Sequence, residues 1–140
     1  MLRRSRIARW MIVPGVLALT AGLIAPVADA GTVPKKRVQA NYFRFCSYRK
    51  DMCTTADEGH RTRVAKGTRV VWIYKDTFCD ASAYCPGHNV KVGQHPRSAT
   101  VKTEGARIFA MTFNTVGRYY YRCTHHVTQG MTGKVVVYSP

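Results

Sequence analysis

TFNTVGRYYYRCTHHVTQGMTGKVVV, residues 112–137, contains two runs of aromatic and β-branched residues separated by a short polar segment. Such residues are enriched in β-strands. We therefore expect strands at 118–123 and at 133–139, with a turn at Gly117 before the first of them. The polar segment between these strands is a loop that joins two neighbouring elements.

The rest of the chain repeats this pattern of short strands separated by turns. No window shows the sustained periodicity of an amphipathic helix. Seven or eight short strands in about 110 residues are typical of an all-β sandwich or barrel. The further strands are expected at 38–45, at two places within 62–76 on either side of Lys66 and Gly67, at 88–92, at 98–104 and at 107–114.

The strand at 118–123 ends on a cysteine that is expected to point into the core. Side chains alternate along a strand, so Tyr119, Tyr121 and Cys123 share one face. The following loop carries His126 three residues later and Met131 eight residues later. A thiolate, two imidazoles and a weak axial thioether form the trigonal site of blue-copper proteins. The loop thus supplies three of four ligands, and a second histidine must come from elsewhere.

His88 is the best candidate for that second histidine. It begins the expected strand at 88–92, directly after a small, polar loop at 77–87. A side chain at this end of a sandwich could reach the same point as the ligands of the later loop.

Three segments of the chain resemble the cupredoxins, most closely the plastocyanin and pseudoazurin groups. They are 112–137, VAKGTRVVWIYKD at 64–76 and GHNVKV at 87–92, and the likeness extends over roughly residues 62 to 139. The spacing of four ligands is far more specific than any single motif. The resemblance implies a Greek-key β-sandwich of eight strands with one type 1 copper ion at one end. The implied ligands are His88, Cys123, His126 and Met131, with Asn89 helping to hold the ligand loop.

Three positions depart from the family's pattern. Arg122 stands where plastocyanin has an exposed tyrosine just before the ligand cysteine. His125 stands where a proline usually precedes the second ligand histidine, so two histidines compete for one role and spacing favours His126. The usual proline before the first histidine is displaced by one residue, as Pro86. We interpret His125 as facing solvent, where it could make the site respond to pH.

The five cysteines leave one unpaired in an oxidising compartment, and Cys123 is the natural one to stay reduced. The other four can pair in three ways, between which the sequence does not decide. By the resemblance, all four lie near the copper end, where disulfides would brace the ligands. These four are Cys46, Cys53, Cys79 and Cys85. The remaining histidines, His60 and His95, have no partner pattern and are expected on the solvated surface.

The N-terminus reads as a secretory signal peptide, residues 1–30, cleaved after Ala30. Four arginines precede an apolar run that ends in Ala-Asp-Ala. An uncleaved membrane anchor is the alternative, although the run is short and contains Pro14. The export route, general or twin-arginine, stays open. A single domain is expected at 31–140.

The expected mature chain is strongly basic, with 18 Lys and Arg against 6 Asp and Glu, or about +12. Such charge favours anionic partners, namely nucleic acid, acidic lipid, a wall polymer or an acidic protein, and does not choose among them. Scattered cations are also typical of a merely solvated surface. We expect a monomer without a nucleic-acid partner and without a membrane span in the mature chain.

The leading hypothesis is an exported carrier of single electrons, extracellular or periplasmic, whose redox partner has an acidic docking face. A copper-binding or copper-delivery protein of the cell envelope, with the metal as cargo, is the alternative. A scaffold used only for adhesion to anionic surfaces leaves the ligand set unexplained. An enzyme is disfavoured, because copper oxidases and nitrite reductases add further domains and histidine clusters.

Overall fold

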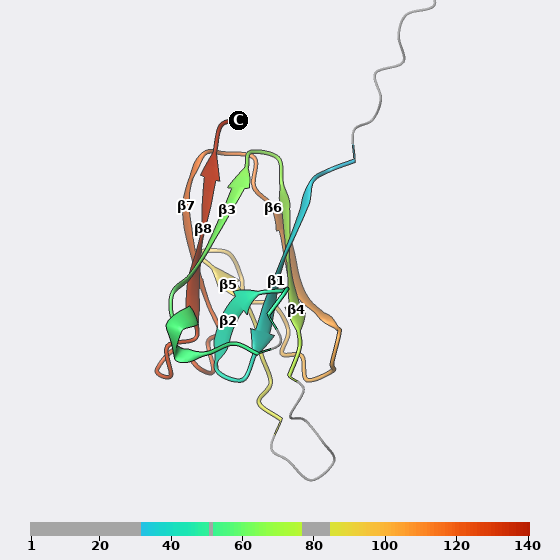
Figure 1. Cartoon of the computed structure of the whole chain (residues 1–140), viewed down its shortest axis with the longest axis vertical. Coiled ribbons are helices and arrows are strands. Elements are labelled where there is room, and N and C mark those ends of the chain that lie inside the picture. Colours follow the sequence, from blue (N-terminus) through green and yellow to red (C-terminus); the bar gives the residue numbers. More distant parts are fainter. Residues whose placement is uncertain (1–31, 51, 77–84) are drawn as a thin grey trace, which may run out of the picture. The chain divides into compact units, whose positions relative to one another are not determined.

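The computed structural model describes residues 32–50, 52–76 and 85–140 (Figure 1). These residues contain eight strands and one short 3-10 helix. The expected signal peptide and Cys79 lie outside these residues. No helix within them is long and apolar enough to cross a membrane. The strands are β1 (Lys35–Asn41), β2 (Arg44–Ser47), β3 (His60–Ala65), β4 (Arg69–Tyr74), β5 (Lys91–Val92), β6 (Arg107–Thr112), β7 (Gly117–Arg122) and β8 (Thr132–Tyr138), and the helix η1 is Thr55–Asp57.

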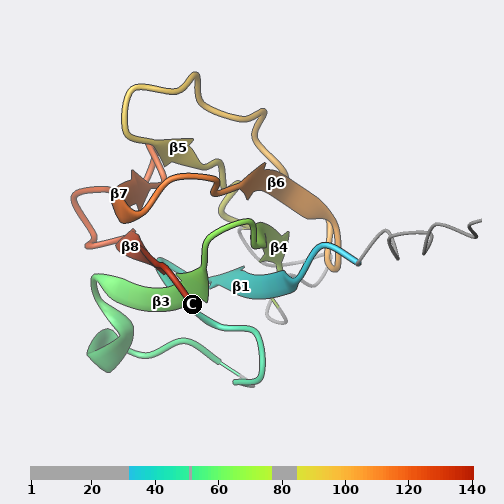
Figure 2. The ribbon, with the colours of Figure 1, turned by 90° about the horizontal axis from the view of Figure 1, so that it is seen from above.

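The strands form two four-stranded sheets that lie as two layers when viewed from above (Figure 2). One sheet has the order β2-β1-β4-β6 and the other the order β3-β8-β7-β5. β1 pairs with β4 in parallel and β3 pairs with β8 in parallel, whereas the remaining pairs are antiparallel. The prediction of an all-β Greek-key sandwich of about eight strands is confirmed.

Aromatic side chains join the two sheets in the core. Val70, Trp72 and Tyr74 alternate along β4, and all three are fully buried. The Trp72 ring lies edge-on to Tyr121 of β7 in the opposite sheet, with ring centroids 5.0 Å apart. Edge-to-face aromatic pairs are stabilising beyond the area that they bury. This contact fixes β4 and β7 against each other, so that the segments after both strands emerge at the same end of the fold.

The run at 38–45 forms a hairpin and not the single strand that was predicted. β1 and β2 pair in antiparallel register as far as Asn41 and Arg44, and only two residues connect them. Tyr42, in that turn, has a φ of 55°. Left-handed backbone is uncommon for a residue with a large side chain. Without a glycine or proline there, the sequence carries no signal for the turn.

The predicted strand at 98–104 is also wrong. An isolated bridge between Val101 and His88 is the only β pairing in this segment. The side-chain oxygen of Ser98 accepts a hydrogen bond from the Val90 N–H at 3.0 Å, and the Ser98 N–H donates to the Val90 carbonyl at 2.9 Å. A side chain thus takes the place of a backbone partner, and no continuous ladder forms.

The polar loop after β2 is closed by a disulfide and an ion pair. Cys46 and Cys53 form a disulfide, with Cα atoms 5.5 Å apart. The sequence had left the partner of each of these two cysteines open. Asp57 accepts hydrogen bonds from Lys50 at 2.5 Å and from the Thr54 backbone N–H at 2.9 Å. Burial favours the neutral acid, but these two donors outweigh it and hold the pKa of Asp57 below its ordinary value.

Replacing both Cys46 and Cys53 by alanine should lower the free energy of unfolding by about 2–3 kcal/mol, because the disulfide restricts the unfolded chain across a short loop. Urea unfolding of the metal-free protein measures this difference. Cys46→Ala alone should lose nearly as much as the double variant. An unchanged unfolding midpoint in both variants would contradict a stabilising disulfide.

Candidate metal centre

Backbone pairing and an aromatic ring hold His88 in place. Its backbone N–H donates to the Val101 carbonyl at 2.9 Å, and its carbonyl accepts from the Val101 N–H at 2.8 Å. The imidazole is fully buried, with its ring centroid 5.2 Å from that of Tyr74. The Tyr74 hydroxyl in turn donates to the Pro86 carbonyl at 3.2 Å. β4 therefore positions His88 although the two are distant in sequence.

The loop between β7 and β8 folds back on itself and presents Cys123 and His126. The Cys123 N–H donates to the Met131 carbonyl at 3.1 Å, which brings the two ends of the loop together. The His126 carbonyl accepts from the N–H of Met131 at 3.1 Å and from that of Gln129 at 3.2 Å. Cys123 and Met131 are fully buried, and His126 is 7% exposed.

Asn89 links this loop to the segment that carries His88. Its side-chain oxygen accepts from the Thr124 N–H at 2.8 Å, and its amide nitrogen donates to the Thr124 hydroxyl at 2.9 Å. Asn89 follows His88 and Thr124 follows Cys123, so the two bonds fix the distance between two expected ligands. This agrees with the role that the resemblance implied for Asn89.

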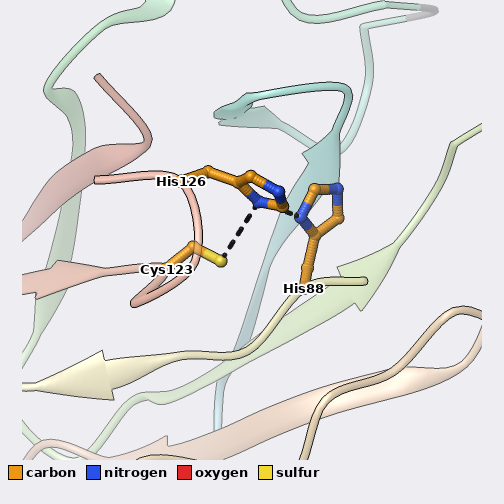
Figure 3. Close-up of side chains that lie close together, drawn as sticks. All are labelled: His88, Cys123 and His126. Atoms are coloured by element: carbon orange, nitrogen blue, oxygen red, sulfur yellow. Dashed lines mark hydrogen bonds between the residues drawn. The ribbon is translucent and has the colours of Figure 1, made fainter. Parts of the chain in front are cut away.

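Three donor atoms face one another at this end of the sandwich (Figure 3). His126 Nδ1 lies 3.3 Å from His88 Nδ1 and 3.4 Å from Cys123 Sγ. Two such donors bound to one ion at about 2.0–2.3 Å lie roughly 3.3–3.8 Å apart at tetrahedral or trigonal angles. A thiolate with two imidazoles suits copper. The two distances from His126 match donors of one copper ion, and all three donor atoms lie within 4.8 Å of one another. Met131 as a fourth ligand stays a prediction.

The two histidines of the cluster are kept neutral by their surroundings. Burial, reinforced by repulsion from His126 and His125, lowers the pKa of His88 to about 3. Burial, together with His125, also lowers the pKa of His126. Metal ligands must be deprotonated. Both imidazoles are therefore ready to bind a metal at neutral pH.

The turn between β1 and β2 covers one side of His126. The ring of Phe43 lies 4.8 Å from the imidazole. Arg44 donates to the carbonyl of Phe43 at 2.8 Å and to that of Gln129, and so ties the turn to the ligand loop. We did not predict these two residues from the sequence, because nothing local marks a contact across 80 residues. A depression of about 490 Å³ opens beside them, lined by Phe43, Gly87, Thr100, Lys102, His125, His126 and Gln129.

The remaining histidines lie outside the cluster. His125 is exposed, and its Nε2 lies 3.0 Å from the Thr100 hydroxyl, so the structure brings His126 and not its neighbour to Cys123. His95 is exposed, as predicted. His60 was predicted on the solvated surface, but it is half-buried at the start of β3, and burial lowers its pKa.

Comparisons with known proteins agree with this geometry. The family model for copper binding proteins of the plastocyanin/azurin family matches residues 55–138. A search of curated proteins gave no match. A solved structure of a methionine-to-alanine mutant of amicyanin, described as Cu(I), is 24% identical over 74% of this chain and 82% of that chain, with a TM-score of 0.51. An oxidized methionine-to-leucine mutant of amicyanin is 25% identical over 74% and 81%, with a TM-score of 0.50. With more than half of its length matched by the family model, a cupredoxin fold and a His-Cys-His cluster, this chain belongs to the plastocyanin/azurin family of copper-binding proteins.

Proposed function

We propose that this protein is an exported blue-copper electron carrier whose copper is bound by His88, Cys123, His126 and Met131. The observation that carries the proposal is the buried cluster of His88, Cys123 and His126, whose donor atoms lie within 4.8 Å of one another. A bound copper ion supplies a one-electron cycle between Cu(II) and Cu(I).

The residues around the cluster would keep the ligands in one arrangement through this cycle. Burial of Cys123 and Met131 excludes water, and the bond between their backbones closes the loop. Asn89 holds the loop to the His88 segment, and Phe43 packs against His126. Ligands that are fixed before the metal changes its charge need little reorganisation, which favours fast electron transfer.

A copper-delivery role is the alternative. A cargo site needs an easy exit for the metal, whereas all four proposed ligands are at most 7% exposed, and three of them lie in a loop closed by backbone bonds. Members of the family are typically carriers, and we propose no enzymatic reaction for this chain.

We propose that residues 1–30 direct export to the periplasm or the extracellular space, and that the mature domain, 31–140, works as a monomer. The basic composition supports an acidic redox partner. The mass of the protein isolated from the cell envelope or medium tests cleavage after Ala30.

The assignment of Cys123 and His126 as copper ligands can be tested by visible absorption. With Cu(II) added, the purified protein should show an intense visible thiolate-to-copper band. Cys123→Ser and His126→Asn should each reduce that band more than 10-fold, because each removes a donor of the cluster. His125→Asn is the matched control and should keep the band, because His125 points to Thr100.

Absorption and metal analysis together separate the two candidate functions. A colourless protein that still binds one equivalent of copper would favour the cargo alternative. A band that survives in His126→Asn but is lost in His125→Asn would contradict the ligand assignment.

The second prediction concerns the link between the two ligand segments. Asn89→Ala should weaken Cu(II) binding by about 10-fold or more, because residues that orient metal ligands typically contribute 10–100-fold to affinity. Competition with a chelator measures this affinity. Thr128→Ala, an exposed change in the same loop, should bind copper like the unaltered protein. Equal affinity in both variants would show that the loop does not need this link.

The third prediction concerns pH. The metal-free protein should lose stability as pH falls from 6.5 towards 3, because unfolded His88 takes up a proton that folded His88 accepts only near pH 3. His126 acts in the same direction, since its pKa is also lowered. Urea unfolding between pH 8 and pH 4 measures the slope.

Substitutions identify which histidines cause this dependence of stability on pH. His88→Gln should flatten it partly, with the remainder due to His126 and His60, whose pKa values are also lowered. His95→Gln, at an exposed position, should leave it unchanged. A stability of the metal-free protein that does not vary over this range would contradict the lowered pKa values of the cluster.

A further inference from the structure

The outer face of the sheet β3-β8-β7-β5 carries a concentration of positive charge. Along β7, Arg118, Tyr120 and Arg122 are exposed, whereas Tyr121 between them is buried. Alternation therefore sends all three exposed side chains away from the core. The two arginines flank Tyr120, which is 63% exposed.

The strand register places further cations beside these residues. Lys134 of β8 pairs with Tyr120 on one side and with Arg61 of β3 on the other. Lys91 of β5 pairs with Arg122. Paired residues on neighbouring strands point to the same side of a sheet. We call this surface the cationic face; it comprises Arg61, Arg63, Lys91, Arg118, Tyr120, Arg122 and Lys134.

No carboxylate neutralises these charges from within the sheet. The four strands contain no Asp or Glu. The ion pair found among the described residues, between Lys50 and Asp57, lies in the loop after β2. The side chain of Glu58, two residues before β3, lies against Gly130 of the ligand loop. The field of the face is therefore positive and would attract an anionic partner.

The face is hollowed as well as charged. A depression of about 380 Å³ is lined by Lys91, Tyr120, Arg122 and Lys134 together with Gly93 and Gly133. Tyrosine and arginine are enriched among the residues that contribute most to protein interfaces. An anionic polymer or a lipid surface would need only the charge.

β7 connects this depression to the metal centre. Arg122 lines the depression, and the next residue is Cys123, whose sulfur belongs to the donor cluster. A partner bound over Tyr120 and Arg122 would lie one residue from that sulfur along the chain. A redox partner gains from this position, whereas a polymer that merely retains the protein in the envelope does not.

We propose that the cationic face is the docking surface for a carboxylate-rich segment of the redox partner protein. This inference rests on the proposed electron-carrier function and names the surface and the chemistry through which the partner is recognised. Association through separate surface charges weakens as salt screens them.

A deca-glutamate peptide is the probe for the test, and the protein is the copper-loaded form, reduced to diamagnetic Cu(I) and labelled with ¹⁵N. Peptide-induced NMR shifts should cluster on the cationic face, that is, on β3, β5, β7 and β8. The dissociation constant should rise at least 10-fold in Arg122→Glu/Lys134→Glu. The control Lys35→Glu/Lys36→Glu makes the same change in net charge on β1, in the other sheet, and should bind within about twofold of the unaltered protein. Shifts located elsewhere, or equal weakening by both variants, would overturn the proposal.

Two further probes test the class of partner. Phosphatidylglycerol vesicles and a 20-nucleotide oligothymidylate should bind no better than the peptide and should be weakened equally by the β1 control and by the face variant. Tighter binding of either that depends specifically on Arg122 and Lys134 would assign the face to a membrane or a nucleic acid and overturn the protein docking surface.

Absorption and voltammetry of each variant separate this inference from the proposed function. If all variants keep the blue band and cycle reversibly, but the peptide causes no shifts on the cationic face, the docking inference alone fails. If the unaltered protein has no blue band while the peptide maps to this face, the electron-carrier function fails, and with it the redox partner, although the anion-binding surface stands.

Discussion

The contact between Trp72 and Tyr121 is the constraint on which the metal centre depends. It joins β4 of one sheet to β7 of the other in a core with no room for either ring to turn away. Two residues beyond Trp72, the Tyr74 ring packs against His88, and two residues beyond Tyr121 lies Cys123. Because both strands place alternate residues in the core, one cross-sheet contact brings the two ligand segments to the same end.

The metal centre is built from polar groups that would be costly to bury one by one. Its imidazoles stay neutral because desolvation lowers their pKa values, and the Asn89 amide satisfies backbone and side-chain groups of Thr124. Neutral donors that face one another in a water-poor pocket are suited to a cation that neutralises the thiolate. The same burial that favours the metal-bound form makes the metal-free form sensitive to acid.

Charge is divided between the interior and the surface. The donor cluster carries no fixed cation, whereas the adjacent outer face of β7 carries Arg118 and Arg122. Arg122 replaces the tyrosine that the resembled plastocyanins have before the ligand cysteine. In the structure it pairs with Lys91 and lines one depression with Lys91 and Lys134, so it is part of the cationic face. One strand thus presents a thiol to the core and cations to solvent.

The sequence alone determined the features that depend on local spacing. The loop from Cys123 to Met131 holds three proposed ligands within nine residues, and the alternation along β7 predicted that Tyr121 and Cys123 share a buried face. His88 and the sandwich fold followed from the same local patterns and from the resemblance to a family. Local order is readable because helix or strand periodicity repeats every few residues.

Only the tertiary structure decided the features that arise where distant segments meet. The turn at Tyr42 carries no glycine or proline, and the approach of Phe43 to His126 spans more than 80 residues. The pairing of Cys46 with Cys53 was one of several that the sequence allowed. The cationic face exists because parallel and antiparallel register aligns four strands that are separate in the chain. Register is set by packing of whole sheets, which no single stretch of residues encodes.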